Sequence, residues 1–118
     1  MSKNAVKWYK IVDATQLLPW QTNAMCVTAI NGKKITLGKH NNQVFAFAHK
    51  CPHAGGIMAD GFIDATGNVV CPLHRYKFSL DKGRNVTGED YYLKTYKVEE
   101  REDGLYIELE EKNFLSFL

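Results

Sequence analysis

Four side chains with metal-binding chemistry occur in two short segments of the chain. The first segment reads C-P-H at residues 51–53, and the second reads C-P-L-H at residues 71–74. Each segment provides one thiol and one imidazole, and the pattern contains no carboxylate. Thiolate and imidazole ligands suit zinc or an iron–sulfur centre, whereas calcium and magnesium prefer oxygen ligands. The sequence therefore predicts one metal centre with the ligands Cys51, His53, Cys71 and His74.

The distribution of the ligand types between the two segments narrows the chemistry. In a common zinc finger, one pair of ligands is two cysteines and the other is two histidines. Here each pair is mixed, so two facing loops could bring both thiols to one side and both imidazoles to the other. A binuclear cluster with two thiolates on one iron and two imidazoles on the other needs this division. A structural zinc ion with the same ligands and a site that binds no metal remain open alternatives.

The C-x-H and C-x-x-H pattern resembles the two cluster loops of the Rieske family. The flanking sequences C-P-H-A-G-G at 51–56 and C-P-L-H-R-Y-K-F at 71–78 are similar to those loops, as are the later Gly61 and Gly83. The resemblance extends over nearly the whole chain and implies one stand-alone ferredoxin domain, residues 1–118. It implies one Rieske-type [2Fe–2S] cluster, with the two cysteines on the buried iron and the two histidines on the outer iron.

The resemblance also implies a function and partners. Within the family, the chain resembles the soluble ferredoxin component of bacterial ring-hydroxylating dioxygenase systems. Such a protein carries one electron from a flavin reductase to a terminal oxygenase and is not catalytic alone. The two further histidines, His40 and His49, belong to no recognisable two-histidine, one-carboxylate iron site. Two other hypotheses are the small subunit of an assimilatory nitrite reductase and a zinc-stabilised interaction module.

Departures from the high-potential members of the family predict a low reduction potential. Those members have a disulfide between the cluster loops, but Gly56 and Leu73 occupy the matching positions here. They also direct serine and tyrosine hydroxyls toward the cluster, where this chain has Tyr76 and Phe78. Fewer hydrogen bonds to the cluster sulfurs stabilise the reduced state less. We therefore expect a potential around −150 mV, the low end of the Rieske range, that falls at alkaline pH.

Composition excludes several other classes of protein. The chain has 118 residues, which predicts one domain, and its 45% hydrophobic and 24% charged residues are ordinary for a globular protein. A net charge of +2 is too small to indicate nucleic-acid binding. No apolar run is long enough for a membrane span, and no signal peptide is recognisable, so we expect a cytoplasmic protein. The third cysteine, Cys26, is expected to be a buried apolar residue, and we expect no disulfide. The oligomeric state stays open.

Short, closely spaced segments rich in β-branched and aromatic residues predict an all-β fold, an antiparallel sandwich or barrel. Asn31-Gly32 and Asp103-Gly104 are typical of type I′ hairpin turns. The resemblance adds a small cluster-binding subdomain, residues 44–80, inserted into a β base. The expected strands are 6–12, 25–30, 34–39, 43–48, 61–63, 68–70, 76–80, 91–99 and 105–109.

Weaker signals concern the surface. His40, in an expected turn, and His49 are both predicted to face solvent. Arg75, with Lys77, could form part of a docking rim for an acidic partner. The apolar segment 114–118 is expected to pack on the β base, with docking of a partner as the alternative.

Overall fold

A computed structural model describes residues 5–52, 55–88 and 91–110, and it confirms the predicted all-β fold. All strand pairings are antiparallel. Two single turns of 3-10 helix, η1 and η2, are the helical elements of the described chain. The elements are β1 (Val6–Val12), η1 (Thr15–Leu17), β2 (Met25–Ile30), β3 (Lys33–His40), β4 (Gln43–Ala48), η2 (Met58–Asp60), β5 (Phe62–Ile63), β6 (Asn68–Val70), β7 (Lys77–Ser79), β8 (Thr95–Tyr96), β9 (Val98–Arg101) and β10 (Gly104–Glu110).

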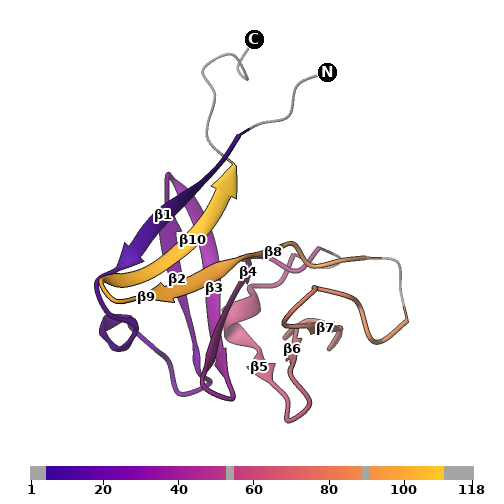
Figure 1. Cartoon of the computed structure of the whole chain (residues 1–118). Helices are drawn as coiled ribbons and strands as arrows, with labels where there is room; N and C mark the ends of the chain where they lie inside the picture. Colours follow the sequence, from indigo (N-terminus) through magenta and orange to yellow (C-terminus); the bar gives the residue numbers. More distant parts are fainter. Residues whose placement is uncertain (1–4, 53–54, 89–90, 111–118) are drawn as a thin grey trace.

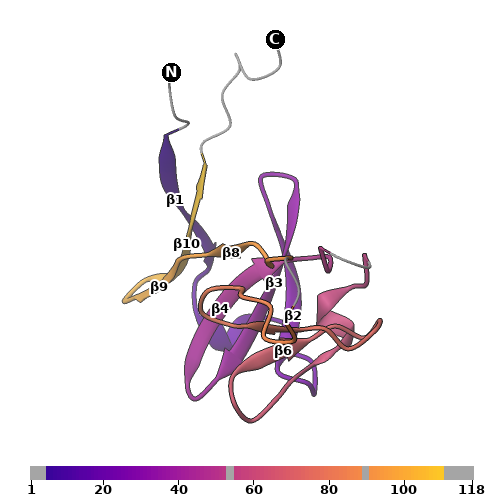
Figure 2. The same cartoon turned by 90° about the vertical axis from the view of Figure 1, so that its right-hand side faces the viewer.

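The described residues form three sheets. The strand orders are β1-β10-β9, β2-β3-β4-β8 and β5-β6-β7. The small third sheet lies beside the middle sheet, on the side away from β1 and β9 (Figures 1 and 2). It includes the strands on both sides of Cys71, so the cysteine segments lie at this end of the molecule.

Two tight hairpins form the middle sheet. Asn31 and Gly32 join β2 to β3 with φ angles of 55° and 78°, as a type I′ turn requires. Asn41 and Asn42 join β3 to β4 in the same left-handed conformation, with φ angles of 52° and 64°. Both turns fix the register of their strands, which brings Cys26 of β2 to the buried side.

The type I′ prediction at Asp103-Gly104 is wrong. Gly104 is already the first residue of β10, and it pairs with Arg101. The turn residues are therefore Glu102 and Asp103, and neither has the positive φ of a type I′ turn. Glycine is needed for another reason, because a Cβ at position 104 would lie 2.4 Å from the carbonyl oxygen of Val12.

Most buried apolar residues of the described chain form two hydrophobic clusters. One group joins the middle sheet to the third sheet and contains both Cys51 and Cys71, together with Phe47 and Phe78. The other lies between the middle sheet and the β1-β10-β9 sheet and contains Cys26. Cys26 is the buried thiol that the sequence predicts, and burial raises its pKa to about 11.

The expected strand 91–99 is interrupted. Residues 91–94 form no strand, and β8 and β9 cover only parts of the expected segment. The backbone N–H of Leu93 donates to the carbonyl of Gly83 at 2.9 Å instead of pairing in a sheet ladder. The tail 114–118 lies outside the described residues. Within the described part, no helix is long and apolar enough to span a bilayer.

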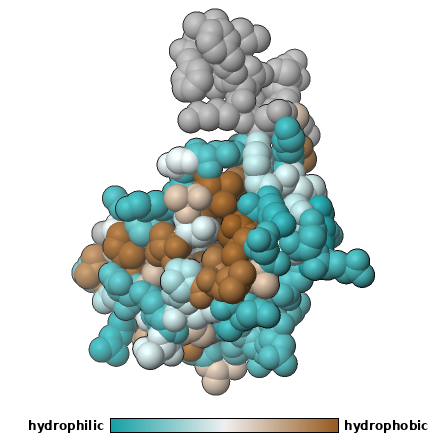
Figure 3. All heavy atoms as spheres, turned by 90° about the vertical axis from the view of Figure 1, so that its left-hand side faces the viewer, coloured by the Kyte–Doolittle hydropathy of each residue, from teal (hydrophilic) through white to brown (hydrophobic). Residues whose placement is uncertain are grey.

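Apolar side chains also reach the surface of the base. Figure 3 shows the face on the left of Figure 1, where apolar residues form a band bordered by polar residues. Leu17 in η1 is 66% exposed. Exposed apolar residues therefore occur well outside the cysteine segments.

Candidate metal centre

The first cysteine loop, residues 49–57, follows β4 and closes tightly around Cys51. The backbone N–H of Cys51 donates to the carbonyl of Gly56 at 2.8 Å, and its carbonyl accepts from Gly55 at 2.9 Å. Gly55 has a φ of 72°, the left-handed conformation that glycine adopts readily. A bridge between Lys50 and Ile57 closes the loop, and Cys51 is buried at its centre. His53 lies outside the described residues.

The second cysteine loop, residues 71–76, connects β6 to β7. The backbone N–H of Cys71 donates to the carbonyl of Tyr76 at 2.8 Å. His74 and Arg75 are both left-handed, with φ angles of 63° and 57°, which reverses the chain within the loop. The result is a buried Cys71 below an exposed His74 and Arg75.

The two loops bring the two cysteines together. The pKa of Cys71 is raised to about 11: burial raises it most, a hydrogen bond from the Leu73 N–H partly offsets this, and a hydrogen bond with Cys51 raises it further. Both cysteines are free thiols. With this raised pKa, the Cys71 thiol stays protonated at neutral pH unless a cation compensates the thiolate charge. Two adjacent buried thiols therefore fit a metal-bound cluster, which would displace their protons.

The glycine after the first cysteine permits this approach. A Cβ at Gly56 would lie 3.1 Å from the sulfur of Cys71 and 3.1 Å from Cγ of Leu73. A side chain at this position would require Cys71 Sγ and the Leu73 side chain to move by a few tenths of an ångström. Gly61 has a comparable role below the loops, since a Cβ there would lie 1.9 Å from the carbonyl oxygen of Val70.

Among the described residues, the structure brings two of the four predicted ligands into contact with each other. Cys51 and Cys71 lie together, and His74 lies on the second loop with its side chain exposed. Within the described residues, no third His, Cys, Asp or Glu completes a group that could hold a metal ion. Coordination by His74, and by His53, is therefore part of the proposal below.

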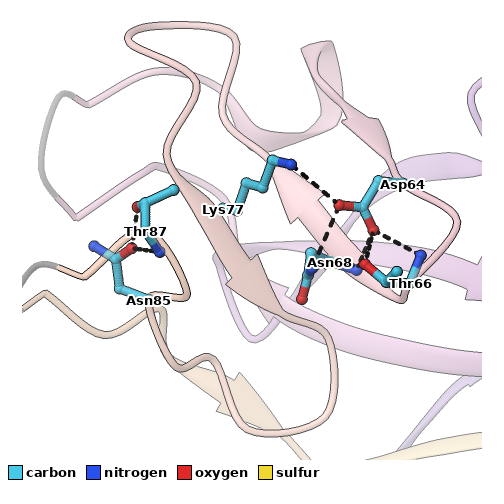
Figure 4. A network of polar contacts seen from close by, with 6 residues as sticks. All are labelled: Asp64, Thr66, Asn68, Lys77, Asn85 and Thr87. Atoms are coloured by element: carbon cyan, nitrogen blue, oxygen red, sulfur yellow. Dashed lines mark hydrogen bonds and ion pairs between the residues drawn. The ribbon is translucent and has the colours of Figure 1, made fainter.

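A carboxylate that the sequence analysis did not single out supports the second loop from below. Asp64 Oδ1 accepts from the backbone N–H groups of Thr66 and Asn68, each at 3.0 Å, and from the Thr66 hydroxyl at 2.8 Å (Figure 4). Its Oδ2 lies 3.7 Å from Nζ of Lys77 on β7. The D-x-T-x-N spacing is typical of a turn in which an aspartate accepts hydrogen bonds from the following backbone. The sequence alone could therefore have predicted this role of Asp64.

The pKa of Asp64 reflects these contacts. Burial alone would raise it, but the hydrogen bonds from Asn68 and Thr66 outweigh burial and lower it to about 2. The ionised carboxylate therefore holds the β5–β6 turn and β7 together. This turn leads into β6, which ends at Cys71.

Both additional histidines differ from their predicted positions. His40 is the last residue of β3, not a turn residue, and is only half-exposed beside Gly67. His49 is only half-exposed, and its Nδ1 is buried and has no hydrogen-bond partner among the described residues. The Met58 N–H donates to the His49 carbonyl at 2.9 Å, which links the backbone of this residue to the start of η2. Burial, followed by Lys34 and Lys50, lowers the pKa of His49.

Sequence comparisons with known proteins found a matching family and relatives of this chain. A family model described as the Rieske [2Fe-2S] domain matches residues 7–97. The ferredoxin component of a naphthalene 1,2-dioxygenase system from Pseudomonas aeruginosa is 27% identical over 104 residues, which cover 87% of this chain and 96% of that protein.

Solved structures share the fold. The ferredoxin of carbazole 1,9a-dioxygenase from Nocardioides aromaticivorans IC177 superposes with a TM-score of 0.72 at 17% identity, covering 85% of this chain and 95% of that one. A protein described as an NADH-dependent nitrite reductase small subunit from Mycobacterium tuberculosis superposes with a TM-score of 0.75 at 18% identity, covering 92% and 100%. At these identities the two structures support the fold alone.

Proposed function

This chain belongs to the Rieske [2Fe-2S] domain family, and on that premise we propose that it passes single electrons from a flavin reductase to a terminal oxygenase. Its cofactor is a Rieske-type [2Fe–2S] cluster. It is an electron carrier that acts with protein redox partners and not an enzyme on its own. The oxygenase partner is suggested by the relative, which is the ferredoxin component of a dioxygenase system, and the flavin reductase is what the resemblance of the cluster loops implies.

We further propose that Cys51 and Cys71 bind one iron and that His53 and His74 bind the other. When bound, the cluster supplies a one-electron centre whose neutral imidazole ligands raise its potential above that of all-cysteine clusters. The cysteine loops exclude water from the thiolates, and the exposed loop of His74 leaves an edge accessible to a partner. The observation that carries this proposal is the pair of adjacent, buried, unbridged thiols.

Iron and sulfide analysis of matched variants tests the ligands. We expect Cys71→Ala to lose the cluster and its red-brown colour, while Cys26→Ala, a change at an equally buried thiol, keeps it. We expect His74→Ala to lose or alter the cluster, while His40→Ala does not. A full complement of iron in Cys71→Ala or an unchanged spectrum in His74→Ala would refute this ligand set.

A reconstituted electron-transfer assay tests the function. NADH, the reductase and the oxygenase of the naphthalene 1,2-dioxygenase system provide defined probes. We expect oxygenase turnover to depend on the loaded protein and to stop when the Cys71→Ala variant replaces it. Electron transfer that proceeds equally without the loaded protein would contradict an intermediary role.

A nitrite reductase small subunit is the alternative that a specific observation favours, since the fold matches one over its full length. That match rests on the fold alone, whereas the dioxygenase ferredoxin matches in sequence across most of both chains. A zinc-stabilised module would be colourless. We also propose a cytoplasmic location and a single domain in which residues 44–80 form the cluster-binding subdomain.

A further inference from the structure

A third loop without any predicted ligand lies beside both cysteine loops. It runs from Gly83 to Lys94, and residues 83–88 and 91–94 of it are described. At its start, the Val86 N–H donates to the Lys77 carbonyl on β7 at 2.9 Å. At its end, the Lys94 carbonyl accepts from the Ala48 N–H at 2.9 Å, just before the first cysteine loop. The third loop therefore borders the strands that carry both cysteine loops, on the right of Figure 1.

Exposed apolar side chains concentrate here. Seven large apolar residues are exposed among the described residues, and four of them belong to the third loop or the second cysteine loop. Tyr92 is the most exposed of the four, at 65%. Exposed aromatic residues beside a functional site are typical of the energetic centre of a protein interface. We call the four residues the apolar rim: Leu73, Val86, Tyr91 and Tyr92.

Hydrogen bonds and a buried side chain hold both described ends of the third loop, which positions the exposed Val86 and Tyr92 next to fixed backbone. Asn85 is buried, and its side-chain oxygen accepts hydrogen bonds from the Thr87 N–H and the Thr87 hydroxyl. Leu93 is buried in the same core as Cys51 and Cys71 and bonds to Gly83. A surface fixed before binding loses less conformational entropy when a partner docks.

Charge indicates the kind of partner. The charged side chains in the described parts of the three loops are all cationic and exposed: Lys50, Arg75, Arg84 and Lys94. The sequence adds Glu89 and Asp90 in the third loop, which leaves four positive charges against two negative ones. A partner surface with an apolar centre and a surplus of carboxylates would complement this end of the molecule.

We propose that the apolar rim is the docking surface through which electrons leave the protein, and that its partner is a redox protein with an apolar, net acidic contact face. This inference rests on the proposed electron-carrier function, because the rim adjoins the loops of Cys51 and Cys71. Tyr92 is the anchor of this surface, and the loop that carries it contains no cluster ligand.

Voltammetry of the loaded protein on gold tests the rim without a natural partner. A methyl-terminated alkanethiol monolayer provides an apolar contact surface, and a carboxylate-terminated monolayer provides an ionic one. On the methyl surface we expect Tyr92→Ser to slow interfacial electron transfer by roughly fivefold or more, as loss of an interface anchor does. We expect Tyr92→Phe to restore the rate and the midpoint potential to stay unchanged in both variants.

Leu17→Ser is the matched control, because Leu17 is equally exposed but lies in η1. We expect its rate to equal that of the wild type. Equal rates for Tyr92→Ser and wild type, or an equal loss in Leu17→Ser, would overturn the docking surface while leaving the electron-carrier function intact. A Tyr92→Ser loss seen only on the carboxylate surface would also overturn it. A wild-type protein with no cluster wave would instead refute the proposed function.

Discussion

A raised thiol pKa alone does not identify the metal centre. Burial raises the pKa of Cys26 to about 11, and Cys71 reaches about 11 as well. Cys71 differs in having a second thiol, that of Cys51, against it and a backbone N–H donor from Leu73. That donor favours the thiolate, which is the form that binds metal. The second thiol and the donor distinguish a candidate ligand from a thiol that only fills the core.

Removing the Asp64 carboxylate should weaken the support of the second cysteine loop. We expect Asp64→Ala to lower the free energy of unfolding by about 1–3 kcal/mol, because two backbone N–H groups lose their acceptor. Thermal unfolding of the loaded protein at pH 7 measures this. Asp81→Ala, a change at an exposed carboxylate, is the control. Equal melting temperatures for Asp64→Ala and the control would contradict the role of this carboxylate.

The same variant has a pH dependence with a defined sign. The pKa of Asp64 is about 2 in the folded protein, below its ordinary 3.8, so ionisation stabilises the folded state above pH 3.8. This stabilisation is lost as the pH falls from about 4 through 2. The gap in melting temperature between wild type and Asp64→Ala should therefore narrow between pH 5 and pH 3. A gap that stays constant over this range would show that the charge of Asp64 does not matter.

At the scale of elements, the two cysteine loops and the third loop lie at the same end of the molecule and contain little regular secondary structure. Close contacts between backbone atoms keep these loops in position. Gly83 has a φ of 72°, and a Cβ there would lie 1.9 Å from the carbonyl oxygen of Leu93. The contact joins the two ends of the third loop. It also holds Leu93 in the core that contains both metal-binding thiols.

Gly83→Ala should therefore displace the third loop. Gly32→Ala is a matched control, since Gly32 has a similar φ of 78° but nothing within 4 Å of its Cβ position. We expect Gly32→Ala to cost about 1 kcal/mol, the ordinary strain of a left-handed alanine, and Gly83→Ala to cost at least about 1 kcal/mol more. Denaturant unfolding measures both changes. Equal costs would mean that the loop tolerates the extra methyl group.

The sequence predicted most strands because their periodicity and their turn residues agree. Asn31-Gly32 is an example, where the dipeptide alone sets the turn. The strand prediction was wrong at residues 91–94. These residues have the aromatic composition typical of a strand, but they form an exposed loop, and the hydrogen bond from Leu93 to the distant Gly83 fixes that loop. The prediction for His49 missed its buried Nδ1, and the backbone hydrogen bond to Met58 of η2 is a contact that the local pattern did not show.

The prediction of the candidate site also came from a local pattern. The cysteine spacing predicted two ligand loops, and the structure brings their thiols together. The support from Asp64 and the placement of Tyr92 depend on how distant segments pack, which local patterns do not specify. The ligand roles of His53 and His74, the subdomain 44–80 and the packing of the tail remain predictions.

At the scale of the whole molecule, charge is uneven although the net charge is only +2. The four cations around the cysteine loops should attract anionic reactants, and salt should screen this attraction. We expect oxidation of the reduced protein by hexacyanoferrate(III) to slow as ionic strength rises. Arg75→Glu should slow it further at low salt, whereas Lys33→Glu in the β2–β3 hairpin should have a smaller effect. Equal effects of the two reversals would indicate that only net charge matters.

The reduction potential of the anaerobically purified protein, followed across pH, tests the central claim most directly. By the resemblance to the high-potential members, Tyr76 stands where they have a serine and Phe78 where they have a tyrosine, and the buried Phe78 has no hydroxyl to offer. We predict a one-electron wave at the low end of the Rieske range, around −150 mV, that falls at alkaline pH. A potential above zero would contradict the low-potential assignment. The absence of any wave would contradict the cluster and, with it, the electron-carrier function.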